Sequence, residues 1–279
     1  SSGSKKPTFT SSDSKVASVN TYGKITAKKA GSATITAKSK NEEASCKVTV
    51  TKTKVTLNKT SLTLENGESA VLTAASSTGH KVTWKSAKTS IASVSENGKV
   101  TAKKPGTTTV TAKVDGTSVN CKVTVKSPTV RLTPSKISLY RKEKYNLKVS
   151  SPSQSTPVWK TNKKSVATVD ETGKVPAVKH GTAVITVTVD GVSKNCEVTV
   201  RSPKITFEQT TITLQPGERA RVNATVSSGN QPAYSCSNTN VVSVDVNGVI
   251  TAKTAGRSYV YASEDGTKER MTVYVKEKE

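Results

Sequence analysis

The sequence predicts an all-β protein made of tandem small β-sandwiches arranged as an elongated rod. Three observations lead to this prediction. Marker residues recur every 75 positions, short runs rich in Val and Thr alternate with a period of two, and nothing reads as a helix of useful length. The chain has 279 residues, which on length alone is enough for two or three ordinary domains.

The repeat is carried by four series of residues that stay in one register without insertions or deletions. It divides the chain into repeat 1 (residues 1–53), repeat 2 (54–128), repeat 3 (129–203) and repeat 4 (204–279). The series are Gly23, Gly98, Gly173 and Gly248; Gly31, Gly106, Gly181 and Gly256; Cys46, Cys121, Cys196 and Met271; and Phe9, Trp84, Trp159 and Tyr234.

Within repeat 2 the strands are expected in seven runs: residues 61–64, 70–74, 81–85, 91–94, 98–102, 108–114 and 118–125. Asp115-Gly116 lies between the last two runs and is the strongest short signal for a β-hairpin. Asp190-Gly191 and Asp265-Gly266 repeat this signal, and Lys40-Asn41 takes the same place in repeat 1. Asn97-Gly98 and Asn247-Gly248 predict a second turn. Seven short strands with regular turns are typical of a small β-sandwich.

One aromatic residue per repeat, at the position of Trp84, is expected between the two sheets. An exposed sugar-stacking aromatic is the alternative, but Phe, Trp and Tyr interchange at this position as core residues do. In the last strand, Val119, Cys121 and Val123 should face inward and Asn120 and Lys122 outward.

The segment "SVSENGKVTAKKPGTTTVTA" (93–112), with "LNKTSLTLENGESAVLTA" (57–74) before it, resembles the bacterial immunoglobulin-like domain, group 2. The resemblance extends over all four repeats and implies immunoglobulin-like sandwiches. It also implies a module of bacterial and phage surface proteins, including adhesins of the intimin–invasin kind, which serves as a stalk or a binding tip. The family has no catalytic motif to carry over. Repeat 4 departs most from the family pattern. It keeps the glycines, but it adds Tyr259 and Tyr261.

Repeat 1 matches only the later part of a unit, so it is interpreted as a partial immunoglobulin-like domain whose first strands are missing. Such a sandwich should expose an apolar face and an open strand edge. The missing strands could belong to chain upstream of this sequence, or a protein partner or a like chain could donate them.

Short junctions join the repeats, as in "VTVKSPTVRL" and "VTVRSPKITF". Pro128 and Pro203 restrict the backbone there, and no flexible spacer intervenes. A semi-rigid rod is therefore expected. At about 3.3 Å per strand residue, each domain should span roughly 35 Å and four domains on the order of 140 Å.

The cysteines at equivalent positions should be free, buried thiols, because each of the first three repeats has only one. Met271 at the fourth place indicates a site for a soft apolar group. An interchain disulfide is the alternative. Cys236 lies on a different strand, has no partner in its repeat and could be buried as well.

No catalytic, cofactor-binding or metal-binding residue is predicted. The two histidines, His80 and His180, fall at non-equivalent positions, and no motif of an enzyme class occurs. The turn residues Asp170-Glu171 and Asp245 with Asn247 could hold Ca²⁺ only weakly, and a role in solvated turns is the simpler interpretation.

The net charge of +23 is uneven, with +7, +7 and +8 on the first three repeats and +1 on the last. The lysines could protect strand edges and aid solubility. They could instead bind an anionic glycan or a cell-wall polymer. Specific nucleic-acid binding is not expected, because stacking aromatics and Arg are scarce, and no segment is suited to membrane insertion. The candidate contacts are Lys24, Lys28, Lys29, Lys99, Lys103, Lys104, Lys113 and Lys122.

Three functions remain open. The first is a non-enzymatic stalk or adhesion segment of an extracellular protein, secreted or on the bacterial cell surface. The second is a basic module that binds anionic glycans or wall polymers. The third is a component of a phage or a surface filament.

Overall fold

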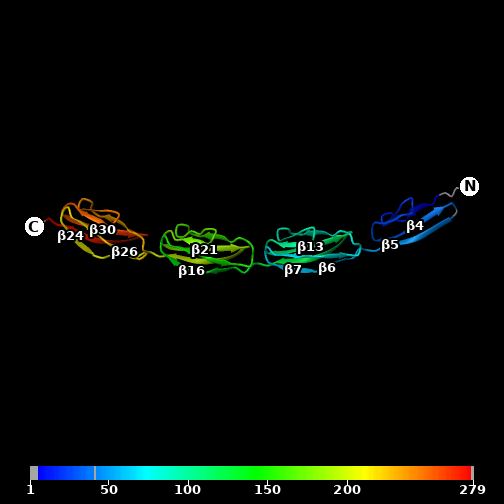
Figure 1. Cartoon of the computed structure of the whole chain (residues 1–279), viewed down its shortest axis with the longest axis horizontal. Coiled ribbons are helices and arrows are strands. Elements are labelled where there is room, and N and C mark those ends of the chain that lie inside the picture. Colours follow the sequence, from blue (N-terminus) through cyan, green and yellow to red (C-terminus); the bar gives the residue numbers. More distant parts are fainter. Residues whose placement is uncertain (1–5, 41, 278–279) are drawn as a thin grey trace. The chain divides into compact units, whose positions relative to one another are not determined.

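The computed structural model describes residues 6–40 and 42–277. The chain divides into two compact units, Ser1–Ser127 and Pro128–Glu279, and each is described here by itself. The first unit contains repeats 1 and 2, and the second contains repeats 3 and 4. All regular structure in the described residues is β, and each repeat forms its own sheets (Figure 1). The predicted all-β fold class is confirmed.

Repeat 2 shows the full arrangement. One sheet has the order β10-β13-β14-β7, a second has the order β11-β12-β8, and β6 pairs with β9. Strand β7 runs parallel to β14, and the other pairs are antiparallel. The strands are β6 (Val55–Leu57), β7 (Ser61–Leu64), β8 (Ser69–Val71), β9 (Ala74–Ser76), β10 (Thr83–Ser86), β11 (Ala92–Val94), β12 (Lys99–Ala102), β13 (Gly106–Val114) and β14 (Thr117–Val125).

The seven predicted runs all contain strands, with two differences. The opening strand β6 was not predicted, and the run at 70–74 splits into β8 and β9. The split occurs at Leu72, whose side chain is buried and whose backbone N donates to Gly98 O at 2.9 Å. The chain leaves the β12 sheet there and goes on to pair with β6, so the core position of Leu72 interrupts the strand.

Repeat 4 has the same topology, with sheets β24-β31-β30-β27 and β25-β29-β28 and the pair β23-β26. Its strands are β23 (Ile205–Phe207), β24 (Thr211–Leu214), β25 (Arg219–Arg221), β26 (Ala224–Val226), β27 (Ala233–Cys236), β28 (Val242–Val244), β29 (Val249–Ala252), β30 (Gly256–Glu264) and β31 (Thr267–Val275).

Repeat 3 differs in one strand. Its sheets are β16-β22-β21-β19 and the pairs β17-β20 and β15-β18, and the place of β11 is reduced to a bridge between Ala167 and Ala177. The strands are β15 (Arg131–Thr133), β16 (Lys136–Leu139), β17 (Lys144–Asn146), β18 (Lys148–Ser150), β19 (Val158–Thr161), β20 (Lys174–Pro176), β21 (Gly181–Val189) and β22 (Val192–Val200).

The predicted hairpins are confirmed in repeats 2 to 4. Between β13 and β14, Asp115 has φ 48° and Gly116 has φ 81°, as a type I′ turn requires. Asp190-Gly191 and Asp265-Gly266 have the same signs. In repeat 1, Lys40 has φ 45°, and Asn41 lies outside the described residues.

The core lies between the two sheets of each repeat. In β14 the inward residues Cys121 and Val123 have no exposed surface, whereas Asn120 and Lys122 point outward, as the alternation predicts. Cys196 and Met271 are buried at the equivalent places. These positions therefore serve packing, and the prediction of buried free thiols holds for Cys121 and Cys196.

The repeated aromatic packs against the repeated glycine. Trp84 is half-buried against the core, which supports its predicted core role. A Cβ on Gly98 would lie 3.0 Å from Trp84 Cζ2 and would also collide with Leu72 O, and the φ of Gly98 is +77°. Only glycine fits such a position without strain. Phe9 with Gly23, Trp159 with Gly173 and Tyr234 with Gly248 repeat this contact.

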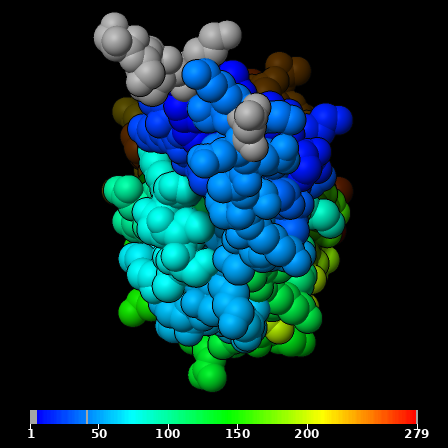
Figure 2. All heavy atoms as spheres, turned by 90° about the vertical axis from the view of Figure 1, so that its right-hand side faces the viewer, coloured from blue at the N-terminus to red at the C-terminus, as the bar shows by residue number. Residues whose placement is uncertain are grey.

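Repeat 1 has fewer strands in its described residues, and its atoms (blue) face the viewer in Figure 2. Its sheets are β1-β4-β5 and β2-β3. The strands are β1 (Thr8–Ser11), β2 (Ala17–Val19), β3 (Ile25–Ala27), β4 (Gly31–Ser39) and β5 (Glu42–Val50).

The prediction that Cys46 is buried is wrong. Within residues 6–40 and 42–277, no strand pairs with the second edge of β5, whereas β14 has β7 there. Cys46 is consequently exposed, and Ile25 is 40% exposed. Within the described residues, Cys46 and Ile25 are thus exposed and one edge of β5 has no paired strand.

We expect Gly98→Ala to lower the free energy of unfolding of repeat 2 by about 3 kcal/mol, because the methyl group adds a collision with Trp84 and Leu72 to the strain of a positive φ. The measurement is urea unfolding followed by Trp84 fluorescence in a Trp159→Phe background, where Phe is the residue that repeat 1 carries at this position.

Gly116→Ala is the matched control. Its φ is also positive, but a Cβ there meets nothing within 4 Å, so the cost should be only about 1 kcal/mol. Equal costs for the two variants would contradict a steric role for the aromatic–glycine contact.

A second expectation concerns thiol reactivity. Burial raises the pKa of the Cys121 and Cys196 thiols, so both should resist an aromatic disulfide reagent until the protein unfolds. The exposed Cys46 should react in the native state. Quantifying released thiolate before and after urea addition tests this, and native labelling of Cys121 as fast as that of Cys46 would refute it.

Candidate functional site

The junction between repeats 3 and 4 is held by a buried carboxylate. The Glu264 side chain, at the end of β30, is only 1% exposed, and its Oε1 lies 2.6 Å from both Nε and Nη2 of Arg141. Ser228 Oγ donates to Glu264 Oε2 at 3.3 Å, and Asn230 Nδ2 donates to Arg141 O at 2.9 Å. A charged hairpin residue of repeat 4 is thus fixed to a loop of repeat 3.

The neighbouring residue extends this junction. The Asp265 side chain is 2% exposed; its Oδ2 accepts a bond of 2.8 Å from His180 N, and its Oδ1 lies 3.2 Å from His180 Nδ1. A cleft of about 620 Å³ beside these contacts is lined by residues of both repeats, including Val178 and Gln231. The non-equivalence of His180 in the sequence therefore marks a contact specific to this junction.

The connecting segment is short and anchored. Residues 201–204 separate β22 from β23. Pro203 is buried, and its carbonyl accepts a bond of 2.9 Å from Thr267 Oγ1. These contacts restrict the linker on the repeat 4 side.

The equivalent hairpin of repeat 2 is bonded to its own loop and to the linker. Asp115 accepts hydrogen bonds from Thr78 Oγ1 at 2.8 Å and Thr53 Oγ1 at 3.3 Å, and it lies 2.9 Å from His80 Nδ1. The hydrogen bond from Thr78, followed by the one from His80, lowers the pKa of the Asp115 carboxyl. The same hairpin position therefore stabilises a turn in repeat 2 and a junction in repeat 4.

The eight candidate lysines are all exposed, and none forms an ion pair in the part of the chain that the structure describes. They do not form a single patch. Lys28 and Lys29 lie in the β3–β4 loop, and Lys103 and Lys104 lie in the equivalent β12–β13 loop. Lys24 precedes β3, Lys99 begins β12, and Lys113 and Lys122 lie on the outer face of β13 and β14.

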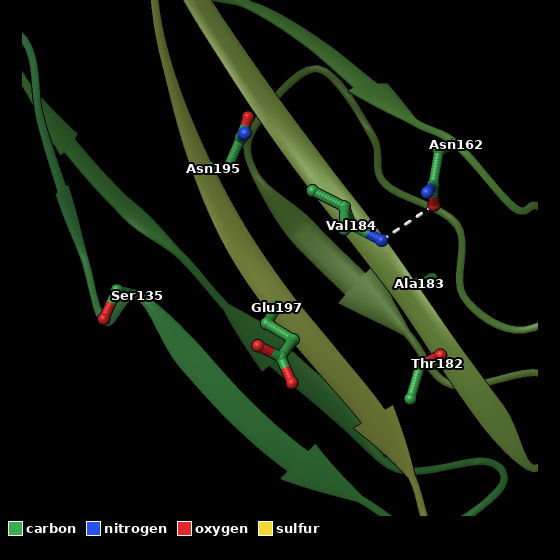
Figure 3. A pocket seen from close by; sticks show the side chains of 7 residues that line it. All are labelled: Ser135, Asn162, Thr182, Ala183, Val184, Asn195 and Glu197. Carbon is green, nitrogen blue, oxygen red and sulfur yellow. Dashed lines mark hydrogen bonds between the residues drawn. The ribbon is translucent and has the colours of Figure 1, made fainter.

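A shallow polar depression of about 470 Å³ lies over β21 and β22 of repeat 3 (Figure 3). The Asn162 side chain points to the strand, and its Oδ1 accepts a bond of 2.7 Å from Val184 N. Asn195 Oδ1 accepts from Thr186 Oγ1, and Glu197 lies 3.1 Å from Lys136 Nζ. These polar groups are thus engaged in holding the sheet.

The carboxylates considered for Ca²⁺ stabilise turns. Asp170 Oδ1 accepts bonds from Thr172 Oγ1 at 2.6 Å and Lys174 N at 3.0 Å, and these interactions lower the pKa of Asp170. Asp245 Oδ1 accepts from the backbone of Asn247 and Val249. Across residues 6–40 and 42–277, no three His, Cys, Asp or Glu residues gather where they could hold a metal ion.

A further cluster that was not predicted from the sequence lies on the outer face of the large sheet of repeat 4. We call it the tyrosine–arginine face and define it as Arg257, Tyr259, Tyr261, Lys268, Arg270 and Tyr274. Two of its tyrosines were noted as departures from the repeat, but not their partners on β31. Strand alternation combined with the hairpin register would have placed all six side chains on one face.

The fold and the repeat define a class of tandem immunoglobulin-like β-sandwiches. The family model of the bacterial Ig-like domain (group 2) matches residues 1–50, 51–127 and 126–200. The chain belongs to this family, as the segment around Gly98 and Gly106 predicted. Repeat 4 lies beyond the matched regions but has the topology of repeat 2.

An uncharacterised protein of Clostridium acetobutylicum is 36% identical in an alignment of 135 residues, which covers 44% of this chain and 14% of that protein. The chain thus spans a small part of that relative's length.

Similar solved structures have low identity. Domains 4–9 of the surface layer protein SbsC are 18% identical with a TM-score of 0.30, covering 96% of this chain and 57% of that one. Invasin, a bacterial integrin-binding protein, is 15% identical with a TM-score of 0.31, and the match covers 90% of this chain and 66% of the invasin chain. The I9–I11 tandem of titin is 14% identical with a TM-score of 0.47, and the match covers 81% of this chain and 100% of the titin chain.

We expect Arg141→Ala to lower the free energy of unfolding of repeat 4 by about 2 kcal/mol, because it leaves the buried Glu264 carboxylate without its cation. Hydrogen exchange of the β30 amides measures this loss.

The double variant Arg141→Ala with Glu264→Val is the control, since repeats 2 and 3 carry Val114 and Val189 at this position. It should restore most of the protection, because the unpaired charge is gone. Wild-type exchange in the single variant would show that the ion pair does not stabilise the junction.

Proposed function

We propose that this chain is a spacer segment of an extracellular bacterial surface protein of the adhesion type, in which tandem domains project a binding part away from the cell. The family membership supports the surface setting. The described residues contain no helix that could cross a membrane.

One observation carries the spacer role. At the junction of repeats 3 and 4, Glu264 and Asp265 are almost fully buried in contacts with Arg141 and His180. A flexible string of domains would leave these charges in water, where they need no partner. Junctions that bury paired charges favour a limited range of orientations, which is what a projecting spacer needs.

Small-angle X-ray scattering of the whole chain tests this proposal. A semi-rigid rod about 140 Å long has a radius of gyration of about 40 Å, from strand dimensions alone. A compact protein of this length would have about 19 Å. A value near the compact limit would refute the spacer role.

Binding of an anionic glycan or wall polymer by the lysines is a second candidate. It is favoured by the exposure of all eight candidate lysines, which have no carboxylate partner within the described residues. Because these charges are separate and solvated, such binding should be purely electrostatic. It should weaken steadily as added salt shortens the Debye length from about 10 Å at 0.1 M.

A further inference from the structure

The outer face of the large sheet differs in kind between repeats 2 and 4. In repeat 2 the outward residues of β13 and β14 include Thr107, Thr109, Thr111, Asn120 and Thr124. The equivalent residues in repeat 4 are Arg257, Tyr259, Tyr261, Arg270 and Tyr274. Apart from Glu264, the buried residues of these strands remain small or apolar in both repeats. Packing therefore does not account for the change on the outside.

The cations of this face are stacked on the tyrosines. Arg270 Cζ lies 4.3 Å from the centroid of the Tyr259 ring, and Arg257 Cζ lies 5.4 Å from the same centroid. Lys268 Nζ lies 4.0 Å from the centroid of the Tyr261 ring. The ring quadrupole attracts each cation, and a stacked guanidinium still has the N–H groups of its edge free to donate. The stacking therefore pre-orders the donors.

The face is positive although repeat 4 as a whole is nearly neutral. The outward positions of β24, β27, β30 and β31 carry three cations and no carboxylate, whereas the acidic residues of the repeat lie elsewhere. None of the three cations forms an ion pair within residues 128–277. An anionic ligand is the complementary partner.

The remaining outward groups indicate the kind of anion. Thr211, Thr213, Ser263 and Thr272 supply hydroxyls, and no Leu, Ile, Val or Met faces outward on these strands. Tyr274 is 37% exposed, and no cation of the described residues lies over its ring. Hydroxyls and an open aromatic ring suit a sugar, which offers both hydroxyls and C–H faces, better than they suit the apolar centre of a protein interface.

We propose that the tyrosine–arginine face binds an acidic polysaccharide. Sugar carboxylates accept hydrogen bonds from the edges of Arg257 and Arg270, and a pyranose ring packs on Tyr274. An extended chain fits an open sheet face, on which outward positions recur about every 7 Å along a strand. This proposal goes beyond the spacer role and uses different residues from the candidate lysines.

The test is calorimetric titration of the whole chain with polygalacturonate, with dextran as the neutral control. The variant Tyr259→Thr with Tyr261→Thr leaves the net charge unchanged and installs the residues of repeat 2. We expect about tenfold weaker binding, because the cations lose their stacking partners. Tyr259→Phe with Tyr261→Phe keeps the rings and should bind within about twofold of the parent.

The outcomes separate this proposal from general attraction to a basic chain. If the Thr variant is folded by circular dichroism and binds as tightly as the parent, the proposal is wrong and charge alone explains the binding. Amide shifts on polygalacturonate addition should centre on β30 and β31, and shifts confined to the lysine loops would also refute it. Polyglutamate bound as tightly as polygalacturonate would assign the face to acidic peptides instead.

Discussion

The contact between one aromatic ring and one glycine determines much of each repeat. Trp84 belongs to one sheet and packs against Gly98, at the turn that enters the other sheet. The same turn bonds to Leu72 through the Gly98 carbonyl, so a single point joins three segments of the chain. A side chain at Gly98 would push the ring and the carbonyl apart. Aromatic and glycine are therefore constrained together, which explains why both series keep the same 75-residue spacing.

The features that could be predicted from sequence are those that depend on local patterns. The strands follow from local alternation, and the hairpins follow from Asp-Gly pairs, because both depend on neighbouring residues. The break at Leu72 could not be predicted, since it depends on a hydrogen bond to a turn 26 positions later. The exposure of Cys46 was missed for a related reason. Equivalent positions were assumed to have equivalent neighbours, but no strand of the described residues pairs with β5 in the way that β7 pairs with β14.

The junction was missed because its residues break the repeat. Glu264 replaces a valine, and Arg141 and His180 have no counterparts in the series, so periodicity gives them no weight. Their partners lie in another repeat, at separations that no local pattern encodes. The tyrosine–arginine face is comparable. Tyr259 and Tyr261 stood out as departures, but only the pairing of β30 with β31 brings them next to Arg270 and Lys268.

The repeats thus combine an inward scheme that hardly changes with outward faces that do. If the two are independent, an outer face should be transferable. The direct test grafts Arg257, Tyr259, Tyr261, Arg270 and Tyr274 onto the places of Thr107, Thr109, Thr111, Asn120 and Thr124 in repeat 2. We predict that the grafted protein has a free energy of unfolding within about 1 kcal/mol of the parent, as expected for exposed strand positions, and binds polygalacturonate more tightly. Loss of folding of repeat 2, or a folded graft with unchanged binding, would contradict it.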